Sequence, residues 1–155
     1  MLPRLLVAVL VLTSVVGCSG PAHAPAGVPA RLVASDVLRS WDEARARAFA
    51  EGDLAALQRL YVPGSAAGTA DVGMLRAYLD RGLRVEGMRM QVLALDVLSA
   101  DGRRLRLRVT DRLADGAVAV GAGTAVALPE DAASTRVVEL VGSGNRGWRV
   151  ASVRE

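Results

Sequence analysis

The chain has 155 residues, of which 52% are hydrophobic and only 3% aromatic, and its formal net charge is +3. This length suits one domain after removal of a leader, with Leu, Val and Ala filling the core. The near balance of charge does not favour the clustered basic face of nucleic-acid-binding proteins, so no nucleic-acid partner is expected.

Residues 1–17 have the pattern of a signal peptide. Arg4 supplies one positive charge, and a largely apolar run, Leu5–Val16, follows it. Twelve helical residues extend roughly 18 Å, which is shorter than the hydrocarbon core of a bilayer at about 30 Å. The run therefore predicts a cleaved export signal rather than a membrane-spanning helix.

The apolar run ends in Val15-Val16-Gly17-Cys18. This sequence resembles the bacterial lipobox, in which aliphatic and small residues precede a cysteine. The resemblance implies cleavage after Gly17 and lipidation of Cys18, the chain's one cysteine, with acyl chains such as palmitate holding it in the membrane. We expect an exported lipoprotein at the outer face of the cell membrane. An incidental cysteine after an ordinary signal peptide is the alternative.

Residues 18–30 are expected to form a tether, because Pro, Ala and Gly dominate them and favour an extended chain. His23 lies there, and nothing fixes its geometry for binding a metal. The folded domain is expected over residues 31–155. All the basic residues are arginine, a bias typical of a GC-rich genome such as that of an actinobacterium.

Three helices are predicted at the start of the domain. Ser35 is expected to cap the first, which ends at Gly52, and Asp53 to cap a second over residues 54–60. A loop over residues 65–69 then leads to a third helix over residues 71–81. In the first helix, one face is apolar, and the opposite, polar face is expected to hold Asp42, Glu43, Arg45 and Arg47.

The second half of the chain has strand periodicity. Apolar residues alternate with arginine and threonine over residues 104–113, which is the clearest strand. Other strands are expected over 83–99, over 117–128 with a bulge at Gly121 and Gly123, and over 135–141 and 148–153. Helices followed by antiparallel strands predict an α+β fold, in which a curved sheet packs around the helices.

Several segments together resemble the nuclear-transport-factor-2-like (NTF2-like) superfamily, which includes ketosteroid-isomerase-like and SnoaL-like domains. They are the helix Trp41–Asp53, the segment Leu54–Gly64, the helix end Tyr78–Gly82 and the closing Gly147–Val150. The resemblance covers residues 31–154 and implies a cone-shaped α+β fold with a pocket between sheet and helices. Because such domains include enzymes, binding proteins and dimerising modules, the fold does not determine the function.

Catalysis of the ketosteroid-isomerase kind needs a carboxylate base and hydrogen-bond donors for an enolate oxygen. Asp111 is the favoured base, because alternation places it on the apolar face of its strand. Tyr61 and Tyr78 are the candidate donors, and Trp41 and Asp96 are further candidates for lining the pocket. Each residue also has a purely structural interpretation, such as an ion pair for Asp111 and core packing for Trp41.

The leading hypothesis is a non-enzymatic domain that binds a small apolar ligand or a cell-envelope protein. The alternatives are a SnoaL-like or ketosteroid-isomerase-like enzyme with Asp111 as base, and a scaffold that forms a homodimer. No cofactor or metal is expected, because the sequence lacks a phosphate loop and a metal-ligand cluster. The basic stretch Arg103–Arg108 is interpreted as a solvated strand face, or as a contact with anionic lipid headgroups.

Overall fold

The computed structural model describes residues 28–114, 116–129, 131–144 and 147–155. The expected signal peptide, Cys18 and His23 lie outside the described residues. Three helices come first: α1 (Val28–Glu51), α2 (Leu54–Arg59) and α3 (Ala66–Leu79). Seven strands follow: β1 (Arg84–Glu86), β2 (Met90–Asp101), β3 (Arg104–Leu113), β4 (Val118–Gly121), β5 (Thr124–Ala127), β6 (Ser134–Gly142) and β7 (Trp148–Arg154).

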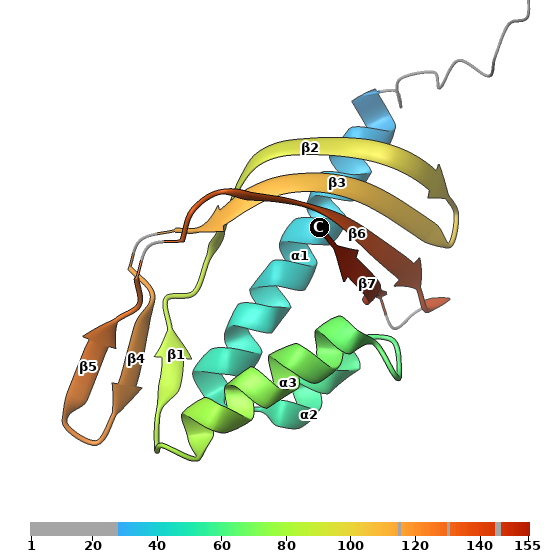
Figure 1. Ribbon diagram of the computed structural model, residues 1–155. Coiled ribbons are helices and arrows are strands. Elements are labelled where there is room, and N and C mark those ends of the chain that lie inside the picture. The colour runs from blue at the N-terminus through green and yellow to red at the C-terminus, as the bar shows by residue number, and fades with distance from the viewer. Residues whose placement is uncertain (1–27, 115, 130, 145–146) are drawn as a thin grey trace, which may run out of the picture.

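The strands form two antiparallel sheets, and the larger one is curved and unclosed. Its strand order is β2-β3-β6-β7, whereas the smaller sheet has the order β1-β4-β5. The larger sheet bends over α1, with α2 and α3 at the far end of that helix and the β4–β5 hairpin projecting to one side (Figure 1). The expected α+β class, with helices packed on a curved antiparallel sheet, is confirmed.

Strand β3 positions the core and the site. Its odd-numbered residues from Leu105 to Asp111 are buried, whereas its arginines at even positions are exposed or half-buried. The predicted alternation is therefore confirmed. The inward side chains pack on the helices in one core whose largest fully buried members include Phe49, Leu57, Leu75, Leu107 and Leu140.

The helix boundaries differ from the expected ones at two N-termini. Helix α1 begins at Val28, so Ser35 is an exposed residue within it and not its cap. Pro29 fits the first turn, where the missing N–H has no helical partner. Helix α3 begins at Ala66, because Ser65 caps it by accepting a hydrogen bond from the Gly68 amide at 3.3 Å. The predicted cap of α2 is confirmed, since Asp53 accepts from the Ala56 amide at 2.8 Å.

Two expected strands are in fact pairs of strands. Residues 117–128 form the β4–β5 hairpin, and the expected bulge is a turn in which Gly123 has a φ of +76°. Residues 83–99 contain β1 and the start of β2, which belong to different sheets. Gly87 separates them with a φ of +70°, and a Cβ there would lie 2.5 Å from the Gly116 carbonyl oxygen. Glycine therefore lets the chain pass from one sheet to the other.

None of the helices in the described part of the chain is long and apolar enough to cross a membrane.

Candidate functional site

A cavity of about 550 Å³ lies between the concave face of the larger sheet and the helices. Its wall is largely apolar. Representative apolar side chains come from α1, α3, β3 and β6: Leu38, Phe49, Met74, Val109 and Val138. The charged side chains in the wall are Asp42, Arg45, Asp71, Asp111, Asp131 and Arg136. The site is thus an apolar chamber with a few polar groups, an arrangement typical of small-molecule sites.

One buried network joins α1 to α3. The Arg45 guanidinium donates to both carboxylate oxygens of Asp71, each at 2.6 Å, and the Tyr61 hydroxyl donates to the same carboxylate at 2.6 Å. Burial opposes the charge on Arg45, but the contact with Asp71 outweighs it and raises the pKa of Arg45. Burial and the Asp71 charge both raise the pKa of Tyr61, so its proton stays on the phenol. This network is a fixed part of the wall.

Asp111 and Arg136 form a second ion pair, between β3 and β6. The guanidinium lies 2.5 Å from Oδ2 of Asp111, whose side chain is only 2% exposed. Oδ1 of Asp111 is enclosed and has no hydrogen-bond partner among the described residues. Burial raises the pKa of Asp111, and the positive charges of Arg136 and Arg45 oppose this rise. The carboxylate therefore has one satisfied oxygen and one enclosed oxygen without a donor among the described residues.

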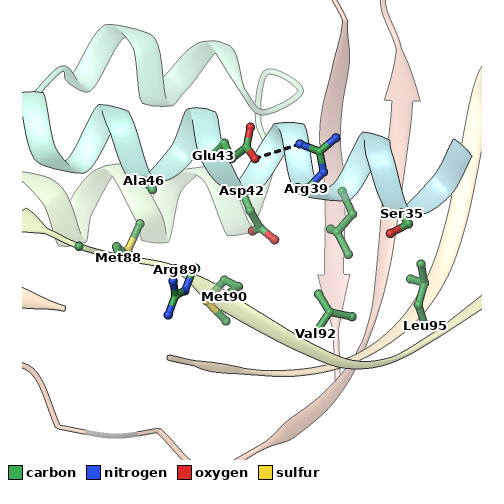
Figure 2. A pocket seen from close by; sticks show the side chains of 12 residues that line it. Ser35, Arg39, Asp42, Glu43, Ala46, Met88, Arg89, Met90, Val92 and Leu95 are labelled. Atoms are coloured by element: carbon green, nitrogen blue, oxygen red, sulfur yellow. Dashed lines mark hydrogen bonds and ion pairs between the residues drawn. The ribbon is translucent and has the colours of Figure 1, made fainter. Parts of the chain in front are cut away.

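Asp42 lies where the cavity meets a groove of about 670 Å³ between α1 and the start of β2. Figure 2 shows its side chain extending from α1 toward the segment that carries Met88 and Met90. Leu38, Asp42, Met88 and Met90 line both hollows. Burial raises the pKa of Asp42 to about 6, with Asp111 adding to the rise and Arg45 opposing it.

The structure brings most of the sequence-predicted residues to this cavity. Trp41, Tyr61, Tyr78 and Asp111 all line it. The Trp41 indole donates to the Leu60 carbonyl at 3.0 Å, and its ring meets Tyr61 edge-on at 5.5 Å. These two aromatic rings are therefore held in fixed positions in the wall.

Asp96 lies outside the cavity, contrary to the expectation. It is exposed on the outer face of the larger sheet, directly opposite Arg108 of β3. Its neighbour Leu95 is buried, and because adjacent residues of a strand point to opposite faces, Asp96 must point outward.

The sequence interpretation missed five of the six charged residues in the wall. Asp42 and Arg45 were expected on the solvent face of the first helix, but both line the cavity. Asp71, Asp131 and Arg136 were not singled out. The only available signal was spacing: Leu38, Asp42, Arg45 and Phe49 follow one another at intervals of three or four residues, which places them on one helix face.

Within the described residues, no group of three or more His, Cys, Asp and Glu side chains is arranged to hold a metal ion.

Comparisons with known proteins support the fold. A structure of a protein from Catenulispora acidiphila is 12% identical, with a TM-score of 0.50, and the match covers 81% of this chain and 91% of that one. A candidate aromatic ring hydroxylase from Novosphingobium aromaticivorans is 13% identical, with a TM-score of 0.50 and coverage of 83% and 88%. No protein-family model and no curated protein matches the sequence.

At this level of identity the likeness shows the fold alone. Helices followed by a curved, unclosed and mostly antiparallel sheet are consistent with the NTF2-like fold that the sequence motifs indicated.

Proposed function

We propose that the domain binds a small, largely apolar ligand in the cavity, and that lipid on Cys18 holds the domain at the outer face of the membrane. The cavity itself is the observation that supports ligand binding. Its volume of about 550 Å³ falls within the range of small-molecule sites, roughly 300–1,000 Å³. A concave apolar wall also suits a small molecule better than a protein partner, whose interface is usually broad.

The polar groups favour binding over proton transfer. An enzyme of the ketosteroid-isomerase kind would use Asp111 as base and a phenol as donor. Here Tyr61 donates its hydroxyl to Asp71, and Asp111 is paired with Arg136. The Tyr61 phenol is thus already engaged, and the charge of Arg136 opposes the rise in the pKa of Asp111 that burial causes. The enzymatic alternative is therefore not favoured.

The groove supplies a route for the ligand. It adjoins the cavity at Asp42 and is lined by apolar side chains such as Leu38, Met90 and Leu95. A ligand that enters between α1 and β2 would reach Asp42 before it reaches the inner wall. On this route Asp42 is the polar group shared by the groove and the cavity, so the ligand passes it on entering the cavity.

The neutral apolar dye N-phenyl-1-naphthylamine tests the proposal. It is titrated into the purified full chain carrying Cys18→Ser, so that no attached lipid competes for it, and its emission is recorded. We expect saturable binding with one site per chain. Ala70→Trp should weaken binding at least tenfold, because Ala70 is an exposed residue that lines the cavity and a large ring there would obstruct its opening.

Ala77→Trp is the matched control, since Ala77 is exposed on the same helix and does not line the cavity. It should leave the affinity unchanged. Absence of saturable binding, or equal weakening by both substitutions, would overturn the ligand-binding proposal.

A further inference from the structure

The charged groups of the cavity wall are not balanced. Four aspartates and two arginines line it. Each arginine is already paired with one aspartate, Arg45 with Asp71 and Arg136 with Asp111. Asp42 and Asp131 have no ion-pair partner among the described residues. The wall therefore has a surplus of negative charge.

Asp111 adds a second and independent observation. Its side chain is 2% exposed, yet Oδ1 meets no donor among the described residues. A buried acceptor without a donor costs about 1–3 kcal/mol, and more if it is charged. Asp111 lines the cavity, so a donor on a ligand that displaces the atoms around Oδ1 would satisfy this oxygen.

We propose that the cavity selects an amphipathic amine, whose protonated head lies between Asp42 and Asp111 and whose apolar body contacts Met74, Val109 and Val138. An ammonium group carries donors and no acceptor, so it can satisfy Oδ1 of Asp111 and neutralise Asp42 together. The inference rests on the proposed ligand-binding function and names the chemistry of the ligand. Asp42 on α1 and Asp111 on β3 both line the cavity, so one ligand head group can lie near both carboxyl groups.

The competing possibility is an acidic ligand held by an arginine. Arg45 is poorly suited to it, because Asp71 occupies two of its donor positions. Arg136 is 30% exposed and contacts Asp111 through one nitrogen, so it is the group that would hold an anion. Such an anion would lie beside the free carboxylate oxygen of Asp111 and would be repelled by it.

Three competitors of similar size distinguish a preference for a cationic ligand from a preference for an anionic one. Naphthalene-2-methylamine, naphthalene-2-methanol and naphthalene-2-carboxylate share one ring system and differ chiefly in the charge of a small head group. Each is used to displace N-phenyl-1-naphthylamine from the full chain at pH 7.5. We expect the amine to bind at least tenfold more tightly than the carboxylate, with the alcohol between them. Asp42→Asn should reduce this preference at least threefold, whereas Asp96→Asn, on the outer face of the sheet, should not change it.

The results distinguish this inference from the function on which it rests. If the dye binds but the amine shows no preference, or the carboxylate binds best, the ammonium site is wrong and the ligand-binding function stands. If neither the dye nor any competitor binds, both are wrong. The comparison of competitors on the native cavity wall needs no substitution there, so a variant that fails to fold cannot obscure it.

Discussion

The protonation of Asp42, which lines the cavity, affects the stability of the fold. Its carboxyl faces Arg45 on its own helix, Asp71 on α3, Asp111 on β3 and Arg136 on β6. Arg39, Glu43 and Arg89 lie around it in the groove. Because burial raises its pKa from 3.8 to about 6, the folded chain keeps a proton that the unfolded chain releases. The free energy of unfolding therefore falls as the pH rises between about 4 and 6.

Asp42→Asn should remove this component of the pH dependence. The amide has a similar shape and no charge, so the substituted chain should gain stability relative to the native chain as the pH rises from 4 to 7.5. The expected relative gain is on the order of 2 kcal/mol. Urea unfolding at several pH values measures it. Asp96→Asn removes an exposed carboxyl and serves as the control. If the difference in stability between Asp42→Asn and the native chain does not depend on pH, the prediction is wrong.

Some residues of the cavity wall could be placed there from the sequence alone, and others could not. Asp111 could be placed on the inner face, because strict alternation in β3 leaves only two faces to choose from. Asp42 and Arg45 could not, because charged residues on a helix next to an apolar stripe usually face solvent. They face the cavity here because the curved sheet leaves a hollow beside α1 and Asp71 neutralises Arg45.

At the scale of one element, substitutions of glycines in helix α3 test how tightly this helix packs against Tyr61 in the cavity wall. Gly68 is buried, and a Cβ added to it would lie 2.7 Å from both Cβ and Cγ of Tyr61. Tyr61 cannot easily move, because Asp71 holds its hydroxyl and Trp41 packs against its ring. Gly68→Ala should therefore destabilise the protein by about 1–3 kcal/mol, even though alanine favours helix formation.

Gly73→Ala is the matched control on the same helix. A Cβ at Gly73 would meet no atom within 4 Å, so only the backbone effect remains. This substitution should stabilise the protein by about 0.5–1 kcal/mol. Thermal or urea unfolding measures the change in the free energy of unfolding, which should have opposite signs in the two variants. Stabilisation by Gly68→Ala would show that Tyr61 is free to move.

At the same scale, long periodic segments were predictable and the junctions between them were not. Strand β3 has ten residues of regular alternation, and its predicted range, residues 104–113, is the observed one. The β4–β5 hairpin was interpreted as one strand, because Gly121 and Gly123 suit a bulge as well as a turn. The pairing of β1 with β4, rather than with its sequence neighbour β2, depends on contacts that are distant in the chain.

At the scale of the whole molecule, the groove begins near the N-terminal end of the described domain. The N-terminal half of α1 contributes Ser35, Leu38 and Arg39 to the groove. Nine residues lie between Cys18 and Val28, where α1 begins. An extended chain over this span reaches about 30 Å, and Ser35 lies roughly 10 Å farther along α1. The proposed lipid would therefore keep the near end of the groove within about 40 Å of the membrane surface.

Cys18→Ser tests the proposed anchoring on the full chain in its bacterial host. Two or more acyl chains give stable membrane attachment, so their loss should move the protein from the membrane fraction to the soluble fraction. Incorporation of labelled palmitate should disappear. The unfolding midpoint should stay the same, because the core lies within the described domain. Ser19→Ala, at the next position, should retain both label and membrane attachment. A Cys18→Ser chain that remains in the membrane fraction would show that another part of the protein holds it there.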